Sequence, residues 1–281
     1  MRNSIRFILV FWLVHFVAKA QKEVSYSHQN ISVLPYSLQN NKELEHLDLS
    51  YSTIEKLPEW LSKFPNLKSV NLNHTRLKNP LNDAQILADC KELLSLHWNY
   101  AHLAYFPIPL AYGKKISTLE LEGNSIPFVP KNIQWLPLKH LNIAHNLVDT
   151  LPNEIIKMKQ LKEINLSFNP ALNNSYNYKI FAKVKSLESL IVQGIKQVPK
   201  ELGEVKQLKK LDFSFASFTN LPTEVKNLPH IESVKIYQAQ SMEVHEFIEQ
   251  ISTWKKVKTL HIGAPNFTRL PFNINKLPNL K

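Results

Sequence analysis

The strongest constraint on this chain is an apolar pattern, Leu-x-x-Leu-x-Leu, that returns along almost its whole length. Leu44, Leu47 and Leu49 form one copy, and later copies follow at intervals close to 23 residues. A unit this short cannot bury its own apolar side chains, so successive units must stack on one another. We therefore expect one elongated body. Counting places from the first apolar residue, the units begin at Leu44, Leu67, Leu93, Ile116, Leu138, Leu161, Leu187, Leu208, Ile231 and Val257.

Each unit is expected to contain one short strand. The first, fourth and sixth places are apolar, and the places between them are mostly polar. Alternation over the fourth to sixth places is the period of a strand with one buried face. Such strands can pair in a parallel ladder about 4.8 Å apart. The remaining residues of each unit must then form the crossover on the other side.

Most crossovers begin with an apolar residue followed by proline. Proline fixes φ and suits the start of a turn or short helix. In one unit Leu57, Leu61 and Phe64 follow at spacings of three or four, which predicts the inner face of one helical turn. The proline steps are Leu34-Pro35, Leu57-Pro58, Phe106-Pro107, Val129-Pro130, Leu151-Pro152, Val198-Pro199, Leu221-Pro222 and Leu270-Pro271.

Three longer units lack the proline step and have a stronger helical pattern. They begin at Leu67, Leu161 and Ile231 and are 26 residues long. Their second halves predict helices wider than a single turn. The predicted helices are Asn82–Glu92, Tyr176–Lys185 and Met242–Trp254.

The segment from Leu138 to Pro152 resembles the leucine-rich repeat consensus, including the asparagine at the ninth place, Asn146. Asn124 and Asn169 match at the same place, and the resemblance extends from Gln21 to Lys281. It implies an α/β fold: a right-handed solenoid with a parallel β-sheet on the concave face and short turns or helices on the convex face. In this family the asparagine hydrogen-bonds backbone groups along the turn. Looser turns, or water, are expected where the ninth place is Ser52, Thr75, Ala101, Ile195, Ala216, Ala239 or Pro265.

The first twenty residues have a different character. Arg2 and Arg6 precede an apolar run from Phe7 to Val17, and Ala18-Lys19-Ala20 offers a small-x-small cleavage pattern. This predicts a secretory signal peptide over 1–20, with an uncleaved anchor as the alternative. The run is shorter than the roughly 20 residues of a membrane span. No later stretch is apolar enough to cross a bilayer.

The mature chain, 21–281, is predicted to be one leucine-rich repeat domain of about eleven repeats. Its last two residues begin another strand, so no C-terminal cap is evident. Solenoids need polar end caps, so we expect further sequence or a partner at this end. Cys90 is the single cysteine, and it is expected to be a buried small hydrophobe. Export predicts a secreted, periplasmic or cell-surface protein.

The chain is basic, with 34 Lys and Arg against 23 Asp and Glu. Basic proteins attract nucleic acids, anionic lipids or acidic polymers, but export makes a nucleic acid an unfavourable partner. Lysines gather near the strand starts and would form one rim of the solenoid. That rim either attracts anionic glycan or is a solvated face neutralised by acids. The neutralising acids would be Glu45, Glu163, Glu188 and Glu232.

Side chains at the fifth, seventh and eighth places are expected to line the concave surface. Aromatic and imidazole groups are frequent at the eighth place, and such residues are enriched at binding hot spots. A row of them would grip a peptide or stack on sugar rings; the alternative is that they only shield the edge of the core. The predicted partner-binding residues are Tyr51, His74, Tyr100, His145, Phe168, Phe215 and Tyr237.

Catalysis has little support in the sequence. His74 and His97 fall on neighbouring strands, with Glu120 one strand further, but three or four converging zinc ligands do not follow from this spacing. Phosphate-loop, His-Glu-x-x-His and Gly-x-Ser-x-Gly motifs are absent from the sequence. The prediction is a non-catalytic binding protein, without metal or cofactor, for a protein or peptide. The alternatives are glycan binding, or the N-terminal recognition arm of a longer receptor or adhesin.

Overall fold

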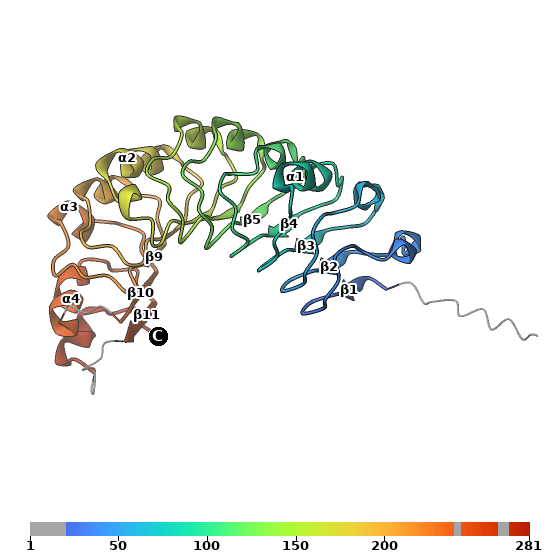
Figure 1. Ribbon diagram of the computed structural model, residues 1–281. Helices are drawn as coiled ribbons and strands as arrows, with labels where there is room; N and C mark the ends of the chain where they lie inside the picture. The colour runs from blue at the N-terminus through green and yellow to red at the C-terminus, as the bar shows by residue number, and fades with distance from the viewer. Residues whose placement is uncertain (1–20, 239–242, 264–269) are drawn as a thin grey trace, which may run out of the picture.

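A curved sheet of parallel strands lines the inner side of the molecule, and helical segments cover its outer side (Figure 1). The computed structural model describes residues 21–238, 243–263 and 270–281. Over these residues the sheet has eleven strands in sequence order, each paired with the strands of the preceding and following units. The expected α/β leucine-rich repeat solenoid is therefore confirmed. The predicted signal peptide lies outside the described residues.

Nine of the eleven strands occupy the third to fifth places of their units, one residue earlier than predicted, and β10 and β11 continue to the seventh place. The sixth-place N–H still continues the ladder, as where Leu49 N donates to Asn71 O at 2.8 Å. The next N–H, of Ser50, instead donates to Asp48 Oδ1 at 3.0 Å, and the strand ends there. The strands are β1 Glu23–Ser25, β2 His46–Asp48, β3 Ser69–Asn71, β4 Ser95–His97, β5 Thr118–Glu120, β6 His140–Asn142, β7 Glu163–Asn165, β8 Ser189–Ile191, β9 Lys210–Asp212, β10 Ser233–Tyr237 and β11 Thr259–Gly263.

The proline steps begin short helices, as predicted. Each proline is the N-terminal cap, and its carbonyl accepts the N–H three residues on, as between Leu61 N and Pro58 O at 3.0 Å. The 3₁₀ segments that begin in this way are η1 Tyr36–Asn40, η2 Glu59–Lys63, η3 Ile108–Tyr112, η4 Lys131–Trp135, η5 Asn153–Lys157, η7 Lys200–Glu204 and η8 Phe272–Lys276, and Pro222 precedes the short helix α3 Thr223–Lys226.

The longer units carry the predicted helices α1 Pro80–Ala88, α2 Ser175–Lys183 and α4 Val244–Ile251. Helix α1 starts two residues earlier than predicted, because the Asn79 side chain caps it by accepting Asn82 N at 3.3 Å. Each helix also ends before its predicted end. Met242, the predicted start of the last helix, lies outside the described residues.

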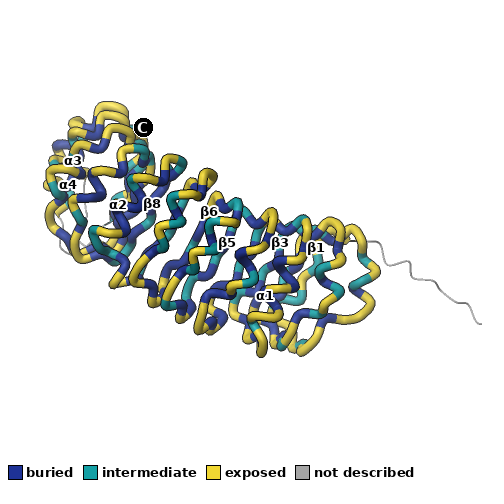
Figure 2. Tube along the Cα trace, turned by 90° about the horizontal axis from the view of Figure 1, so that it is seen from above, coloured by how far each residue is buried: buried dark blue, intermediate teal, exposed yellow. Residues whose placement is uncertain are grey.

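The core is continuous along the solenoid. The first, fourth and sixth places face inward, and Leu44, Leu47 and Leu49 are all at most 2% exposed. Figure 2 shows the resulting alternation of buried and exposed stretches from one unit to the next. Cys90 is 4% exposed within this core, as predicted, and burial raises the pKa of its thiol to about 12.

The ninth-place asparagines bond the backbone as the family resemblance implied. Asn146 Nδ2 donates to Leu121 O, Ile143 O and Ala144 O at 2.9–3.1 Å, and its Oδ1 accepts Ile126 N at 3.0 Å. In two of the units that lack this asparagine, another side chain makes one of these bonds.

The hydroxyls of Ser52 and Thr75 stand in for the asparagine amide in those two units. Each hydroxyl donates at 2.7 Å to the carbonyl three residues earlier. A short hydroxyl side chain therefore reaches the same acceptor, but it makes one bond where Asn146 makes four. Ala239 and Pro265 lie outside the described residues.

A second kind of side-chain hydrogen bond links each longer unit to the unit before it. The leucine of a Leu-Pro step has a buried N–H that cannot join the sheet. A polar side chain from the following longer helix accepts it, which the sequence pattern did not predict. The pairs are Leu57 N with Asp83 Oδ1 at 2.7 Å, Leu151 N with Asn177 Oδ1 at 2.9 Å, and Leu221 N with Gln250 Oε1 at 2.5 Å.

Candidate functional site

The eighth-place residues share an unusual backbone conformation. Tyr51 and His145, for example, have φ of 55° and 52°, in the left-handed region that costs an L-residue roughly 1–2 kcal/mol. The N–H at this place donates to the seventh-place carbonyl of the next unit, as from Tyr51 to Asn73 at 2.8 Å. The same turn therefore recurs in register, and it brings the eighth-place side chains to one edge of the concave sheet.

Four of these side chains form a continuous stack over the first units. Ring centroids are 4.5 Å apart between His28 and Tyr51, 4.2 Å between Tyr51 and His74, and 5.0 Å between His74 and Tyr100. The interplanar angles are 8–13°, so the rings lie almost parallel. His28 was not among the predicted residues, although it lies 23 residues before Tyr51 and so occupies the same place.

The other predicted residues lie further along the molecule, all at the eighth place except Tyr237, which is the last residue of β10 and precedes the eighth-place Gln238. His145 and Phe168 stack at 4.2 Å with an angle of 20°. Phe215 meets Tyr237 edge-on at 6.2 Å and Phe168 at 5.9 Å in a tilted arrangement. We refer to His28, Tyr51, His74, Tyr100, His145, Phe168, Phe215 and Tyr237 as the aromatic row.

Glycines interrupt the aromatic row. Gly123 and Gly194 stand at the eighth place with φ of 67° and 73°. The ring of the preceding unit lies over each glycine: a Cβ on Gly194 would sit 2.6 Å from the Phe168 ring, and one on Gly123 would strike Tyr100. The glycines therefore seat Tyr100 and Phe168; Gly123 separates the first stack from His145 and Phe168, and Gly194 lies between Phe168 and Phe215.

The aromatic row presents mainly ring edges to solvent, because stacking covers ring faces. Tyr51 is 50% and Tyr100 is 41% exposed. The Tyr100 hydroxyl donates to Glu122 Oε1 at 2.7 Å, and this bond raises the pKa of Tyr100 to about 12. Ring edges and hydroxyl groups suit contacts with polypeptide, whereas a stacked sugar needs a free ring face.

A polar network occupies the concave face beside the first stack. His97 Nδ1 lies 3.1 Å from Glu120 Oε2, and Asn99 Nδ2 donates to the same oxygen at 3.1 Å. The hydrogen bond from His97 holds the pKa of Glu120 below its usual range. The structure thus joins His97 to Glu120, while His74 is held in the aromatic row between Tyr51 and Tyr100.

Ser95 extends this network into a Ser–His–Glu chain, since its Oγ lies 2.9 Å from His97 Nε2. Acyl transfer would also need N–H donors for an oxyanion. The Ser95 N–H is donated to Lys68 O at 3.0 Å, and the Thr118 N–H on the next strand is donated to Leu94 O at 3.0 Å. The hydrogen-bonded ladder that holds the strands therefore uses both of these N–H donors.

In the nine units that begin at Leu44 to Ile231, the seventh-place N–H is satisfied in one of two ways, a rule that the sequence pattern did not reveal. Where the fifth place is Asp or Asn, its Oδ1 accepts the seventh-place N–H of the same unit, as Asn142 does from Ala144 at 3.0 Å. Otherwise the seventh-place side chain of the preceding unit accepts it. The second kind comprises Asn99 N to Asn73 Oδ1, Glu122 N to Asn99 Oδ1, Gln193 N to Ser167 Oγ and Tyr237 N to Ser214 Oγ, at 2.7–3.3 Å.

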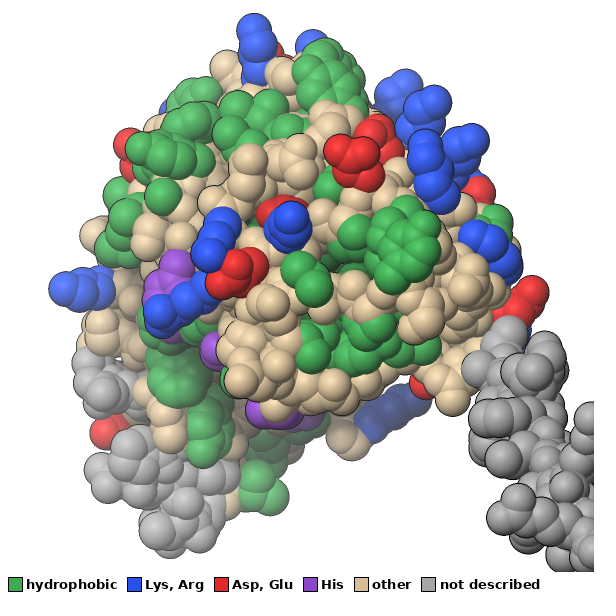
Figure 3. All heavy atoms as spheres, turned by 45° about the vertical axis from the view of Figure 1, so that its right-hand side comes forward, with side chains coloured by type: hydrophobic (Ala, Val, Ile, Leu, Met, Phe, Trp, Pro, Cys, Tyr) green, Lys and Arg blue, Asp and Glu red, His purple; other side chains and the backbone are tan. Residues whose placement is uncertain are grey.

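The lysine rim is largely ion-paired where acids alternate with lysines along the second place. Glu45 lies 2.8 Å from Lys22 and 2.5 Å from Lys68, and these bonds lower the pKa of Glu45 to about 2. Glu188 likewise lies between Lys162 and Lys209, at 3.7 and 3.2 Å. Figure 3 shows acidic groups interspersed among the basic ones on the visible face. The rim is therefore a mixed-charge surface rather than a uniformly basic one.

In the part of the chain that the structure describes, no group of three or more His, Cys, Asp or Glu side chains is arranged to hold a metal ion. None of the helices described is both long and apolar enough to traverse a bilayer.

Comparison with known proteins agrees with this architecture. The model of the family described as Leucine Rich Repeat matches residues 43–64. Lumican from Oryctolagus cuniculus is 31% identical over 164 residues, which cover 55% of this chain and 80% of that protein. The chain is a leucine-rich repeat protein. Osteomodulin from Rattus norvegicus is 30% identical over 149 residues, or 51% of this chain, and the match covers only about a third (34%) of that protein.

Solved structures show the same fold at low sequence identity. An internalin from Listeria monocytogenes superposes with a TM-score of 0.63 and 17% identity, over 92% of this leucine-rich repeat protein and 72% of that chain. Toll, in its complex with Spatzle from Drosophila, gives 0.61 and 19%, over 82% of this chain and 31% of that one. These likenesses concern the solenoid itself.

Proposed function

We propose that this leucine-rich repeat protein is an exported, non-catalytic binding protein that holds a protein or peptide along the aromatic row. The observation that carries the proposal is the repeated left-handed turn, which places a ring at the same edge of the sheet in seven units and Gly123, Gly194 or Gln238 in three others. Tyr51, Tyr100 and Phe215 are each 41–50% exposed there. A surface already in place loses little ordering entropy on binding.

The similarities to known proteins support a polypeptide ligand. One structural neighbour, Toll, is described as part of a complex with Spatzle. Because this chain spans about a third of osteomodulin, a whole-protein activity cannot be transferred from such a match. The partner class is therefore proposed from the surface chemistry of the aromatic row together with this neighbour.

Export and domain organisation belong to the same proposal. The basic residues Arg2 and Arg6, the apolar run and the Ala18-Lys19-Ala20 pattern support a signal peptide over 1–20. The repeat domain would then span 21–281 and reach the periplasm, the cell surface or the medium. A recognition arm of a longer receptor or adhesin is compatible with the same surface.

A glycan is a weaker candidate than a polypeptide. Stacking against Tyr51 and Tyr100 covers both faces of His74, so its ring is closed to sugars. The acids that pair with the lysine rim also weaken its attraction for an anionic polymer. The Asn, Gln and His side chains beside the aromatic row instead match the donors and acceptors of a peptide backbone.

The proposal is tested with a peptide selected from a random displayed library on the immobilised protein. The triple variant Tyr51→Ala, Tyr100→Ala and Phe215→Ala should lower the affinity for the selected peptide about tenfold or more, which corresponds to about 1.4 kcal/mol of binding free energy. Tyr36→Ala and Tyr112→Ala are matched controls, since these tyrosines are 73% and 53% exposed in the outer segments η1 and η3. Undiminished affinity in a well-folded triple variant would reject the aromatic row as the binding site.

A further inference from the structure

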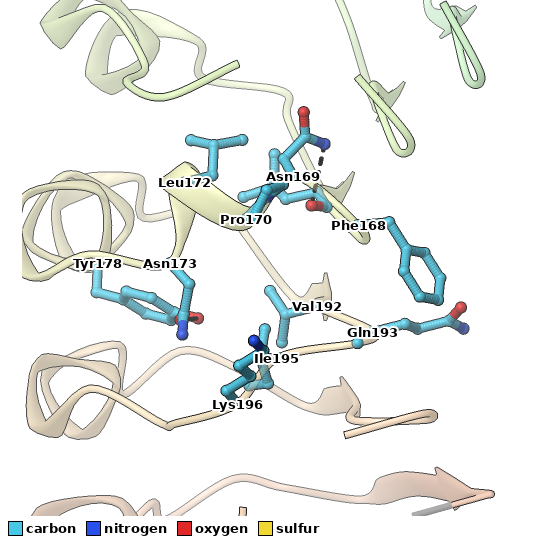
Figure 4. Close-up of a pocket in the computed structure, with 12 residues that line it drawn as sticks. Phe168, Asn169, Pro170, Leu172, Asn173, Tyr178, Val192, Gln193, Ile195 and Lys196 are labelled. Atoms are coloured by element: carbon cyan, nitrogen blue, oxygen red, sulfur yellow. Dashed lines mark hydrogen bonds between the residues drawn. The ribbon is translucent and has the colours of Figure 1, made fainter. Parts of the chain in front are cut away.

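A cavity of about 490 Å³ lies between the unit that begins at Leu161 and the unit that begins at Leu187. Ligand pockets generally measure about 300–1,000 Å³ and are mostly apolar. In Figure 4, Phe168 and Gln193 lie at one end, Tyr178 and Asn173 at the other, and Val192 and Ile195 between them. The cavity thus extends from the aromatic row towards helix α2.

The sequence opens this junction through two changes. Proline follows Asn169 and begins a 3₁₀ turn, η6 Pro170–Leu172, which redirects the loop. The next unit has Ile195 at the ninth place. Asn169 bridges to the preceding unit through its Nδ2, 2.8 Å from Ile143 O, and an isoleucine cannot make such a bond. A side-chain bond from Asn173 Nδ2 to Gln197 O, at 2.6 Å, spans the gap instead.

The walls of the cavity are held in place. Tyr178 is only 1% exposed, and its hydroxyl donates to Asn173 Oδ1 at 3.0 Å. Phe168 is fixed over Gly194 and stacks on His145 at 4.2 Å. Because Phe168 belongs to both the aromatic row and the cavity wall, one ligand can occupy both.

We propose that this cavity receives a branched or aromatic side chain of the polypeptide partner; the inference rests on the proposed function. The apolar walls suit such a side chain, and the volume leaves room for its flanking backbone. Asn173 and Gln193 each use one of two amide N–H donors, to Gln197 O and Asp212 Oδ2. Their remaining N–H and oxygen capacity matches peptide groups, which a free amphiphile lacks.

The direct test uses methyl NMR of the full chain with four probes: N-acetyl-L-leucinamide, N-acetyl-L-tryptophanamide, N-acetylglycinamide and dodecanoate. The first two should cause saturable, millimolar shifts of the methyl groups that line the cavity. N-acetylglycinamide has no anchoring side chain and should cause none. The reporting methyl groups belong to Leu166, Leu172, Val192 and Ile195.

Two variants localise the effect. Ile195→Phe fills the cavity and should therefore abolish the methyl shifts. It should also lower the affinity for the library-selected peptide about tenfold. Leu147→Phe adds the same ring at a site that is 64% exposed and outside the cavity, and it should change neither result. If Ile195→Phe does not fold, the wild-type methyl shifts still decide the question.

Each remaining outcome overturns the inference. Shifts with dodecanoate alone would assign the cavity to a free amphiphile, and shifts with none of the probes would show that the cavity is closed to ligands. The proposed function is separable from this result. If Tyr51→Ala and Tyr100→Ala lower the affinity for the selected peptide while Ile195→Phe does not, the cavity inference fails and the aromatic row remains the binding site. If Tyr51→Ala, Tyr100→Ala and Ile195→Phe all leave that affinity unchanged, the proposed function fails.

Discussion

Asp83 is the residue whose chemistry fits its surroundings least well. It is fully buried, and its Oδ1 accepts Leu57 N, but Oδ2 has no hydrogen-bond partner among the described residues. Burial raises the pKa of this carboxyl group. Asn177 holds the equivalent position in the next longer unit, and there the Nδ2 donates to Leu172 O at 2.9 Å. An amide therefore suits this position better than a carboxylate.

We predict that Asp83→Asn stabilises the protein at pH 7 by about 1–3 kcal/mol, because it removes a buried charge and keeps the acceptor. When folding raises the pKa of a carboxyl group, that group destabilises the folded state at every pH above its pKa in the unfolded chain. Wild type should therefore lose stability relative to the variant as pH rises from about 4 through the raised pKa. Urea unfolding across this range measures the difference.

Asn177→Asp is the matched control and should introduce the same pH-dependent penalty into the second longer unit. Equal pH profiles for wild type and Asp83→Asn would show that the buried carboxylate is not destabilising.

Tyr100 offers a spectroscopic test of the hydrogen bond to Glu122. Since the bond favours the neutral phenol, the Tyr100 pKa of about 12 lies above the usual value near 10. The ultraviolet difference between wild type and Tyr100→Phe should titrate near this higher value. Glu122→Gln should bring the midpoint back towards 10. A midpoint near 10 in wild type would mean that the phenol is not held by Glu122.

At the scale of the element, each turn is secured by side chains that satisfy backbone groups. Asn146 alone makes four such bonds, whereas Thr75 makes one. The asparagine place could be predicted from the repeat consensus. The hydroxyl substitutes could not, because the repeat consensus has asparagine at this place. The second source of acceptors for the seventh-place N–H could not either, because it depends on which side chain the preceding unit brings within reach.

Asn146→Ala should destabilise the protein by roughly 2–5 kcal/mol, because buried N–H and C=O groups lose their partners. Thr75→Val removes a single buried hydroxyl and should cost only about 1 kcal/mol. Chemical denaturation of both variants measures the contrast. Equal losses would mean that the asparagine contributes no more than one hydroxyl bond.

At the scale of the whole molecule, the period of the apolar pattern was sufficient to predict a single stack with a parallel concave sheet. It also aligned Tyr51, His74 and Tyr100 at one place of successive units. It did not show that these rings would stack face to face, since that follows from the left-handed turn. Nor did it reveal the cavity, because Pro170 and Ile195 matter only when two units are side by side.

The central claim is that a polypeptide partner lies along the aromatic row on the concave edge. Photo-crosslinking of the library-selected peptide tests it directly, with p-benzoylphenylalanine replacing Phe215 in one variant and Trp135 in another. Both side chains are exposed, at 43% and 56%, but Trp135 ends the outer segment η4. We expect crosslinking from the Phe215 position and none from the Trp135 position. Crosslinking from Trp135 alone would contradict it.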